Sequence, residues 1–240
     1  FEPGSYAQIK IPAFTIDYDK DFDKSLIGDT YLPAWKNFGL FNLKCVNDTP
    51  TIRAYSMANY PDEGDIITLN VRIATPPFKP KEQGGGFMDV NPGIASSYIF
   101  SLKPGDKVIM SGPYGEFRPQ YGTGREMIWV GGGAGMAPLR AQIMHMLKTL
   151  NTRDREMHYF YGARALEEIP FLDDFLALEK EYDNFHFHLA LDRPDPKADA
   201  AGIKYTPGFV APVMGDTYLK QHENPEDVEY YLCGPPMMAK

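Results

Sequence analysis

A cluster of glycines between an apolar run and a helical pattern constrains the fold of this chain most. Glycine occupies four of the five positions 131–135, directly after the apolar residues 127–130, and apolar residues then recur at helical spacing from Leu139 to Leu150. This order predicts a strand, a tight turn and a helix. Glycines let a backbone approach a diphosphate, and a helix amino terminus favours its charge. A purely structural turn is the alternative interpretation. The spacing is not Gly-x-Gly-x-x-Gly, which argues against the ordinary dehydrogenases.

Strands and helices continue to alternate after this turn. We predict strands over residues 157–161, 186–191 and 229–232, and a helix over 171–182. Such alternation indicates a doubly wound parallel sheet.

The first half has a different pattern, with short strand-like segments separated by turn residues, and it predicts an antiparallel β-barrel. Because 240 residues suit two domains, we predict a β-barrel domain over 1–124 and an α/β domain over 125–240 that is incomplete at its carboxyl end. The predicted strands cover 5–11, 51–55, 66–73 and 107–111, and the polar segments 17–36 and 76–92 are predicted to be loops or insertions.

Composition excludes several function classes. The chain has 32 acidic and 24 basic residues, a net charge of -8, and no basic stripe, which argues against binding to nucleic acid. Two cysteines, Cys45 and Cys233, make neither a disulfide framework nor an iron–sulfur or zinc pattern, so we expect a reducing compartment and no metal site. Of the five histidines only His186 and His188 are close in sequence, and we interpret them as structural. No run of about 18 apolar residues is present, so we expect a soluble chain without a membrane span.

The segment Arg53-Ala54-Tyr55-Ser56 combines three side chains that suit a flavin. Arg53 can form a fork to a diphosphate, Tyr55 on the same strand face can lie flat on an isoalloxazine ring, and Ser56 can hydrogen-bond near the flavin N5. A surface strand with a core tyrosine is the alternative interpretation of this segment.

This Arg-x-Tyr-Ser segment resembles the flavin signature of the ferredoxin-NADP reductase superfamily. Three further motifs resemble those of the superfamily and occur in its order, at Gly93–Tyr98, Gly131–Pro138 and Cys233–Met238, and Gly112–Phe117 resembles its barrel-closing turn. The resemblance implies FAD bound to the barrel, with its diphosphate at a helix amino terminus. It also implies a nicotinamide cofactor at the glycine turn and Cys233 near the nicotinamide, in a contact role rather than as a nucleophile.

The resemblance also implies the site residues. Asp192 stands where relatives that use NADPH hold its 2′-phosphate, and a carboxylate there favours NADH. The predicted catalytic residues are Tyr55, Ser56 and Cys233. The predicted FAD-binding residues are Arg53, Tyr55, Ser56, Asn59, Val71, Arg72, Gly93, Ala95, Ser96 and Ser97, and the predicted NADH-binding residues are Gly132, Gly133, Ala134, Gly135, Met136, Pro138, Arg164, Asp192, Cys233, Gly234 and Pro235.

Longer segments are similar to the F subunits of the bacterial sodium-translocating NADH:quinone oxidoreductases; they are residues 53–61, 70–76, 131–140, 161–164 and 230–238. This similarity implies that electrons pass from NADH through FAD to a [2Fe-2S] centre and on to a quinone. It implies partners outside these residues, namely a ferredoxin-like [2Fe-2S] domain, an N-terminal membrane helix and other subunits, on the cytoplasmic side of the inner membrane. Because the chain starts at Phe1 without Met, we expect it to be an excised piece.

Two other functions stay open. The chain can be the reductase component of a multicomponent oxygenase, or a flavin reductase, in which case only the electron acceptor differs. It can also be a flavin-binding docking or regulatory module that has lost turnover, although the intact glycine and Cys233 motifs argue against this.

Overall fold

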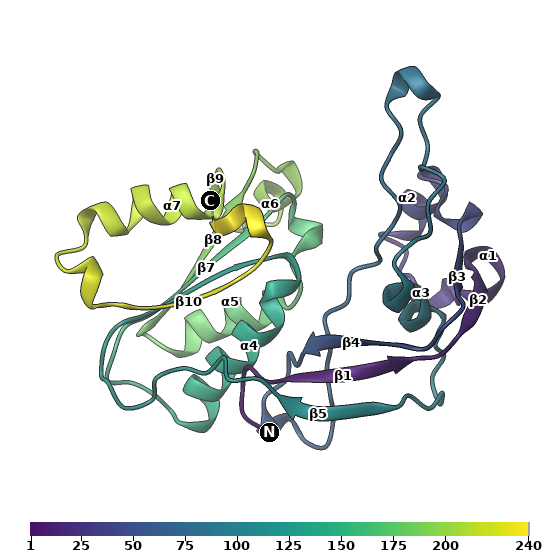
Figure 1. The fold of residues 1–240 in the computed structure, drawn as a ribbon. Coiled ribbons are helices and arrows are strands. Elements are labelled where there is room, and N and C mark those ends of the chain that lie inside the picture. The colour runs from purple at the N-terminus through teal and green to yellow at the C-terminus, as the bar shows by residue number, and fades with distance from the viewer. Residues whose placement is uncertain (240) are drawn as a thin grey trace. The chain divides into compact units, whose positions relative to one another are not determined.

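The structure is a computed structural model that describes residues 1–239 (Figure 1). Contacts between residues divide the chain into two compact units. We call residues 1–6, 56–70 and 113–240 the parallel-sheet unit, and residues 7–55 and 71–112 the N-terminal unit. The predicted domain boundary at residue 124 stays a prediction.

The parallel-sheet unit is built on five strands in the order β10-β6-β7-β8-β9, and every neighbouring pair is parallel. Parallel strands that are covered on both faces have continuously apolar sequences. Strand β6 has such a sequence, and all of its residues are buried. The strands are β6 (Met127–Gly132), β7 (Met157–Ala163), β8 (Phe185–Leu191), β9 (Thr206–Pro207) and β10 (Glu229–Cys233).

Helices cover both faces of this sheet (Figure 1). Side chains alternate between the faces of a strand, so Trp129 and Tyr159 pack with α4 and α5, whereas Ile128 and Phe160 pack with α7. The helices are α4 (Met136–Met144), which continues as a π-helical turn over His145–Thr149, then α5 (Leu172–Glu181), the short α6 (Pro196–Ala200) and α7 (Val210–Thr217).

The N-terminal unit contains most of two small sheets, one with the order β4-β1-β5 and the antiparallel pair β2-β3. Its buried apolar cluster consists of Ile16, Tyr18, Phe22 and Cys45. Its elements are β1 (Tyr6–Ile11), β2 (Phe14–Asp17), α1 (Tyr18–Asp21), α2 (Leu32–Asn37), β3 (Lys44–Asn47), β4 (Thr51–Ser56), α3 (Ile94–Ser101) and β5 (Met110–Tyr114).

The predicted fold class, antiparallel β followed by parallel α/β, is confirmed. The strand predicted over residues 66–73 is wrong, because only Leu69 makes a bridge there, to Met57. The Asn59 side chain donates to the carbonyl of Ile66 and accepts from the amide of Thr68, so it uses backbone groups that a sheet ladder would need.

Two further segments in the first half differ in detail from the prediction. The segment 17–36, predicted to be a loop or an insertion, contains α1 and most of α2. Asp17 caps α1 by accepting from the amide of Asp19, and a proline lies in the first turn of α2, so the polar residues and prolines start helices here. The last predicted strand lies three residues further along, at Met110–Tyr114.

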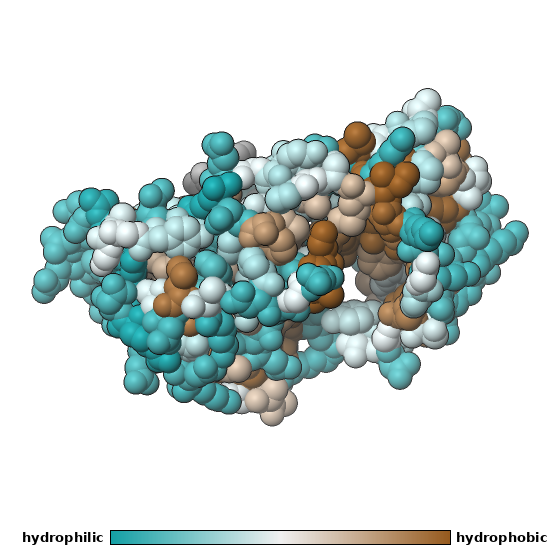
Figure 2. Space-filling model, turned by 90° about the horizontal axis from the view of Figure 1, so that it is seen from below, coloured by the Kyte–Doolittle hydropathy of each residue, from teal (hydrophilic) through white to brown (hydrophobic). Residues whose placement is uncertain are grey.

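Large apolar side chains are also exposed, among them Ile52, Ile109 and Phe209. Figure 2 shows hydrophobic side chains gathered in one part of a face that is otherwise mainly hydrophilic. Within residues 1–239, no helix combines the length and the apolar character that crossing a bilayer requires.

Candidate functional site

The carboxyl edge of the parallel sheet brings two of the predicted motifs together. Cys233, the last residue of β10, pairs with Gly131 near the end of β6. The chain leaves β6 towards β7 on one side, while β10 lies on the other, so the strand order reverses at this point. Open α/β sheets bind their ligands in the crevice at such a reversal.

The glycine turn approaches the Cys233 backbone so closely that no side chain fits at Gly135. A Cβ atom there would lie 1.9 Å from the carbonyl oxygen of Cys233 and 2.8 Å from the amide nitrogen of Gly234. Gly133 is a glycine for another reason, since its φ of 55° is left-handed and the space around it is open. The turn is therefore packed against the Cys233 backbone at Gly135 and has open space around it at Gly133.

The rest of the turn is held from below by buried groups. The Tyr161 hydroxyl donates to the carbonyl of Gly133 at 3.1 Å, and the Tyr159 hydroxyl donates to the Met136 sulfur at 3.0 Å. Met136 and Pro138 are buried in the first turn of α4, whose N-cap has no side-chain hydrogen bond.

Gly132, Ala134, Gly234 and Pro235 complete the turn and its surroundings. A Cβ at Gly132 would contact Pro235 at 3.3 Å, and one at Gly234 would lie 3.2 Å from the amide nitrogen of Gly132, while Ala134 is exposed. First-turn amides without side-chain partners make a cradle for a diphosphate, so these residues fit a dinucleotide.

Arg164 and Asp192 lie at the same edge, where β7 and β8 end. The amide of Asp192 donates to the carbonyl of Ala163 at 3.1 Å, which holds the two loop starts together. The Arg164 guanidinium pairs with Glu168 at 2.7 Å, and this hydrogen bond and charge raise the pKa of Arg164. The Asp192 carboxylate accepts from Arg193 at 3.0 Å, so it adds an acceptor to this edge.

Cys233 is half-buried, and burial raises the pKa of its thiol. The thiol is therefore protonated at neutral pH, which suits a contact group rather than a nucleophile.

A second candidate site lies at the amino terminus of α3 in the N-terminal unit. Gly93 is the N-cap and has no side-chain cap; a Cβ there would lie 2.5 Å from the Cβ of Ala74. Ser96 and Ser97, both buried, donate to the carbonyl of Gly93 at 3.1 and 2.7 Å, and Ser97 also bonds the Tyr18 hydroxyl at 2.7 Å. The serines thus fix the start of the helix and leave its first-turn amides for an anion. Ala95 is buried beside them.

The flavin-type residues of β4 follow one another along the strand. Arg53 is exposed, and its guanidinium donates to Thr51 Oγ1 at 2.9 Å and to the carbonyl of Ile52 at 2.8 Å. Tyr55 and Ser56 are half-buried, and burial raises the pKa of the Tyr55 phenol. An aromatic ring beside a flexible cation provides the groups that an FAD site requires.

Three other predicted FAD residues have different surroundings. Asn59 is fully buried, and its amide side chain bonds the backbone at Ile66 and Thr68 at 2.7 and 2.8 Å, so its visible work is structural. Val71 is half-buried and Arg72 is exposed, in a segment without regular structure.

Arg140 is a residue that sequence reasoning missed. Its buried guanidinium donates to the carbonyl of Ala58 at 2.8 Å, to Glu63 at 2.7 Å and to Asp174 at 2.8 Å. These carboxylates raise the pKa of Arg140. It therefore ties α4, which starts at the glycine turn, to α5 and to the segment 58–63. An arginine within the apolar pattern of α4 was the available signal.

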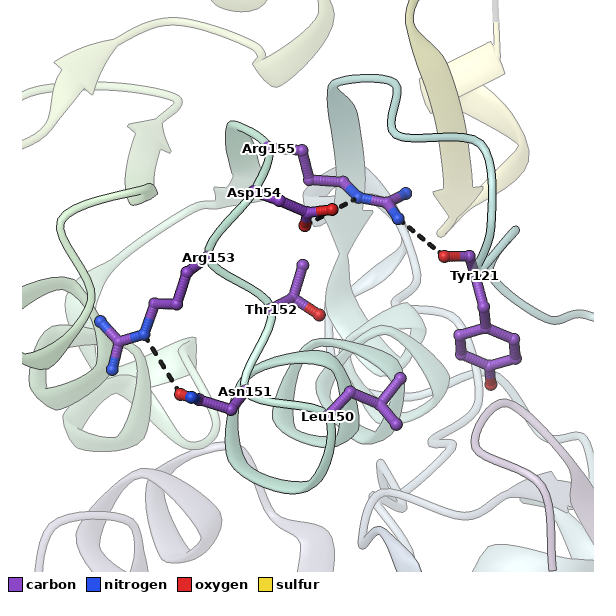
Figure 3. A pocket seen from close by; sticks show the side chains of 7 residues that line it. All are labelled: Tyr121, Leu150, Asn151, Thr152, Arg153, Asp154 and Arg155. Atoms are coloured by element: carbon purple, nitrogen blue, oxygen red, sulfur yellow. Dashed lines mark hydrogen bonds and ion pairs between the residues drawn. The ribbon is translucent and has the colours of Figure 1, made fainter.

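A polar pocket elsewhere in the parallel-sheet unit contains none of the predicted site residues (Figure 3). Arg155 donates to the carbonyl of Tyr121 at 2.7 Å, and Arg153 donates to Asn151 at 3.2 Å. The two arginines are occupied by the protein itself, so we assign this pocket no ligand. It is lined by Tyr121, Leu150, Asn151, Thr152, Arg153, Asp154 and Arg155.

In comparisons with known proteins, two regions of the chain match two different family models. Residues 37–119 match the family model of the oxidoreductase FAD-binding domain, and residues 129–240 match that of the oxidoreductase NAD-binding domain. The chain thus has an FAD-binding and an NAD-binding domain.

Among curated proteins, the chain is 50% identical over 238 residues to the F subunit of the Na(+)-translocating NADH-quinone reductase of Psychrobacter cryohalolentis, and 48% identical to that of Yersinia enterocolitica. Each match covers 99% of this chain and 54% of the relative, so the chain spans about half the length of these relatives.

Solved structures share the fold at low identity. The cytochrome b5 reductase domain of Ulva prolifera nitrate reductase has a TM-score of 0.66 at 22% identity, covering 99% of this chain and 77% of that one. Ferredoxin-NADP+ reductase from Plasmodium falciparum has a TM-score of 0.63 at 17% identity, covering 100% of this chain and 76% of that one.

Proposed function

Since the chain belongs to the ferredoxin-NADP reductase superfamily of FAD- and NAD-binding oxidoreductases, we propose that it takes electrons from NADH onto FAD and passes them to a further acceptor. FAD and NADH supply the hydride and electron chemistry when bound, and the protein supplies position and electrostatics.

At the parallel sheet, we propose that backbone amides of Gly132, Gly133, Ala134 and Gly135 hold the NADH diphosphate. Met136 and Pro138, buried in the first turn of α4, offer it no free N–H and support the turn by packing. The close contact between Gly135 and the Cys233 backbone supports this assignment. Only glycine fits at position 135, and it allows both motifs to lie in one crevice.

The neighbouring strand ends orient the rest of the NADH molecule. We assign Cys233, Gly234 and Pro235 to the nicotinamide side, and Arg164 and Asp192 to the adenosine side. The Asp192 carboxylate accepts from a ribose hydroxyl and repels a 2′-phosphate, which favours NADH over NADPH.

In the N-terminal half, we assign the FAD diphosphate to the first turn of α3, at Gly93, Ala95, Ser96 and Ser97, and to the Arg53 guanidinium. Tyr55 would pack on the flavin ring, and Ser56 would hydrogen-bond near N5, the atom that accepts a hydride, and so orient that part of the ring. We keep Asn59, Val71 and Arg72 as supports of this site.

The test is anaerobic mixing of the FAD-loaded chain with NADH, followed by absorbance of the bound flavin. We expect the absorbance of the bound flavin to decrease after mixing with NADH. We also expect a higher specificity constant for NADH than for NADPH. A chain that retains FAD but is not bleached by NADH is a binding module and contradicts the proposed function. Variants separate the parts: Arg53→Ala is expected to weaken FAD retention, and Ser56→Ala to slow flavin bleaching while FAD stays bound.

We further propose that the acceptor is a [2Fe-2S] centre on a ferredoxin-like domain of the longer protein, within a sodium-translocating NADH:quinone reductase at the cytoplasmic side of the bacterial inner membrane. The 50% identity to the F subunit of such an enzyme supports this assignment. In the longer protein, electron paramagnetic resonance after NADH addition is expected to show a reduced [2Fe-2S] signal. Its absence, with bleached flavin, would favour an oxygenase reductase component or a flavin reductase.

A further inference from the structure

The amino-terminal edge of the parallel sheet gathers histidines that are far apart in sequence. The register of β7 and β8 pairs His158 directly with His186, and both precede the carboxyl edge where the glycine turn lies. Since side chains alternate, Glu156 and His188 share the sheet face of these two histidines, which is the face covered by α7.

Three of these groups have the spacing of metal ligands. One ligand atom each from Glu156, His158 and His186 lies within 4.8 Å of the other two. His186 Nε2 is 2.9 Å from Glu156 Oε2, and the rings of His158 and His186 stack with their centroids 4.8 Å apart. The side chains of His158, His186 and Glu156 are 7%, 38% and 55% exposed, so the group is anchored at one end and open to solvent at the other.

We propose that Glu156, His158 and His186 form a binding site for a divalent transition metal ion, with Zn²⁺ as the ligand to which we commit. Two imidazole nitrogens and one carboxylate oxygen suit Zn²⁺, whereas Mg²⁺ and Ca²⁺ prefer oxygen ligands throughout. Three protein ligands leave a fourth tetrahedral position for water at the exposed side.

The groups around His158 are placed to orient it as a ligand. His158 Nδ1 is 3.0 Å from His188 Nε2, and His158 Nε2 is 2.9 Å from the Tyr218 hydroxyl, which in turn donates to Glu126 at 2.7 Å. If one ring nitrogen of His158 binds the metal ion, the hydrogen bond of that nitrogen is replaced by the metal–nitrogen bond. The other then fixes the ring, as hydrogen-bonded partners of metal-bound histidines do.

The neighbouring pair His222 and Glu126 is a less suitable alternative. His222 Nε2 is 2.8 Å from Glu126 Oε2, much as His186 is from Glu156, but the Glu126 carboxylate also accepts from Tyr218 through its other oxygen and is therefore less free to bind a metal ion. The proposed site joins β7 to β8 at their amino ends, so bound Zn²⁺ stabilises the sheet rather than taking part in hydride transfer.

The experiment uses the tag-free, FAD-loaded chain after removal of metals with a chelator, titrated with zinc chloride by calorimetry and followed by thermal unfolding. We expect one equivalent of Zn²⁺ per chain, a raised unfolding midpoint, and Co²⁺ absorption typical of a four-coordinate ion. His186→Ala and Glu156→Gln are each expected to weaken Zn²⁺ binding by on the order of tenfold or more. Both residues are partly exposed, so their variants test the site without emptying the core as His158→Ala does.

The matched controls are His145→Gln, in the π-helical turn after α4, and His222→Gln. Both are expected to bind Zn²⁺ like the unsubstituted chain, and flavin bleaching by NADH is expected to stay unchanged in all four variants. The proposal is overturned if Zn²⁺ uptake is not saturable, if His186→Ala and Glu156→Gln bind as tightly as the unsubstituted chain, or if His222→Gln loses as much affinity as they do. A chain that binds Zn²⁺ as expected but is not bleached by NADH leaves the site intact and refutes the oxidoreductase proposal alone.

Discussion

The two edges of the parallel sheet use different parts of the chain. At the carboxyl edge the proposed NADH site is made mainly of backbone, with glycines that allow the turn after β6 to contact the Cys233 carbonyl. At the amino edge the proposed zinc site is made only of side chains, from β7, β8 and the residue before β7. A site built from backbone requires particular residues in one short segment, whereas a site built from side chains requires a particular strand register.

The largest effect that we predict tests the backbone edge. Gly135→Ala places a Cβ where the Cys233 carbonyl oxygen lies 1.9 Å away, so the turn or β10 has to move. A displacement of about 1 Å in a positioning element costs on the order of a hundredfold in rate. We therefore expect flavin bleaching by NADH to slow by that factor, with FAD retention unchanged, in stopped-flow measurements.

Gly122→Ala is the matched control, because a Cβ at that position meets nothing within 4 Å. It is expected to bleach at the unsubstituted rate. If Gly135→Ala bleaches equally fast, the close approach of the two motifs does not position NADH, and the contrast between the edges fails.

The same contrast explains how much of the site could be predicted from the sequence. The glycine turn and the Cys233 motif are each contiguous, so their residue types identified them and the strand pairing only brought them together. The group of Glu156, His158 and His186 could not be found in this way, because His158 and His186 are 28 positions apart and meet only through the β7–β8 register.

The fold shows a similar division. Strands of the parallel sheet were predicted within two residues at each end, because each is a short run of mainly apolar and aromatic residues, except for the two-residue β9, which was not predicted. Helix α7 was also missed, since Val210–Thr217 contains a proline and a glycine. In the first half, the predicted strand at 66–73 is absent because Asn59 binds that backbone through its side chain, an interaction between residues that no periodicity reveals.

The next prediction tests whether the side-chain edge is independent of NADH. Burial first, and neighbouring histidines next, lower the pKa of His158 to about 3, so the ring is neutral at pH 8. His158→Ala leaves Tyr218 and His188 without their buried partner, which costs about 2 kcal/mol of unfolding free energy. Urea unfolding of the metal-free chain at pH 8 measures this loss.

NADH binding to the same variant is expected to match the unsubstituted chain, because His158 lies at the opposite end of β7 from the glycine turn. A larger dissociation constant for NADH, together with the lost stability, would show that the two edges are coupled through the sheet.

A smaller effect is expected where the carboxyl edge does use a side chain. Asp192→Asn removes the carboxylate that we assign to the ribose, and with it the repulsion of a 2′-phosphate. We expect the ratio of specificity constants for NADH over NADPH to fall by about tenfold, or 1.4 kcal/mol. Asp216→Asn, on the exposed side of α7, is the control and is expected to leave the ratio unchanged. An unchanged ratio in Asp192→Asn would remove this residue from the site.

The smallest effect distinguishes the two cysteines, one in each unit. Burial raises the pKa of both thiols, and Cys45 is fully buried whereas Cys233 is half-buried at the turn. Since only the thiolate reacts, alkylation of Cys233 by iodoacetamide is expected to be slow at pH 7 and to rise about tenfold per pH unit up to pH 9. Cys45 is expected to react only in urea.

Added NAD⁺ is expected to slow the reaction of Cys233 a few-fold by covering the turn, without affecting Cys45. A rate that levels off below pH 8 would mean that the thiol is activated rather than suppressed, and Cys233 would then act through its sulfur and not only through the backbone that Gly135 contacts.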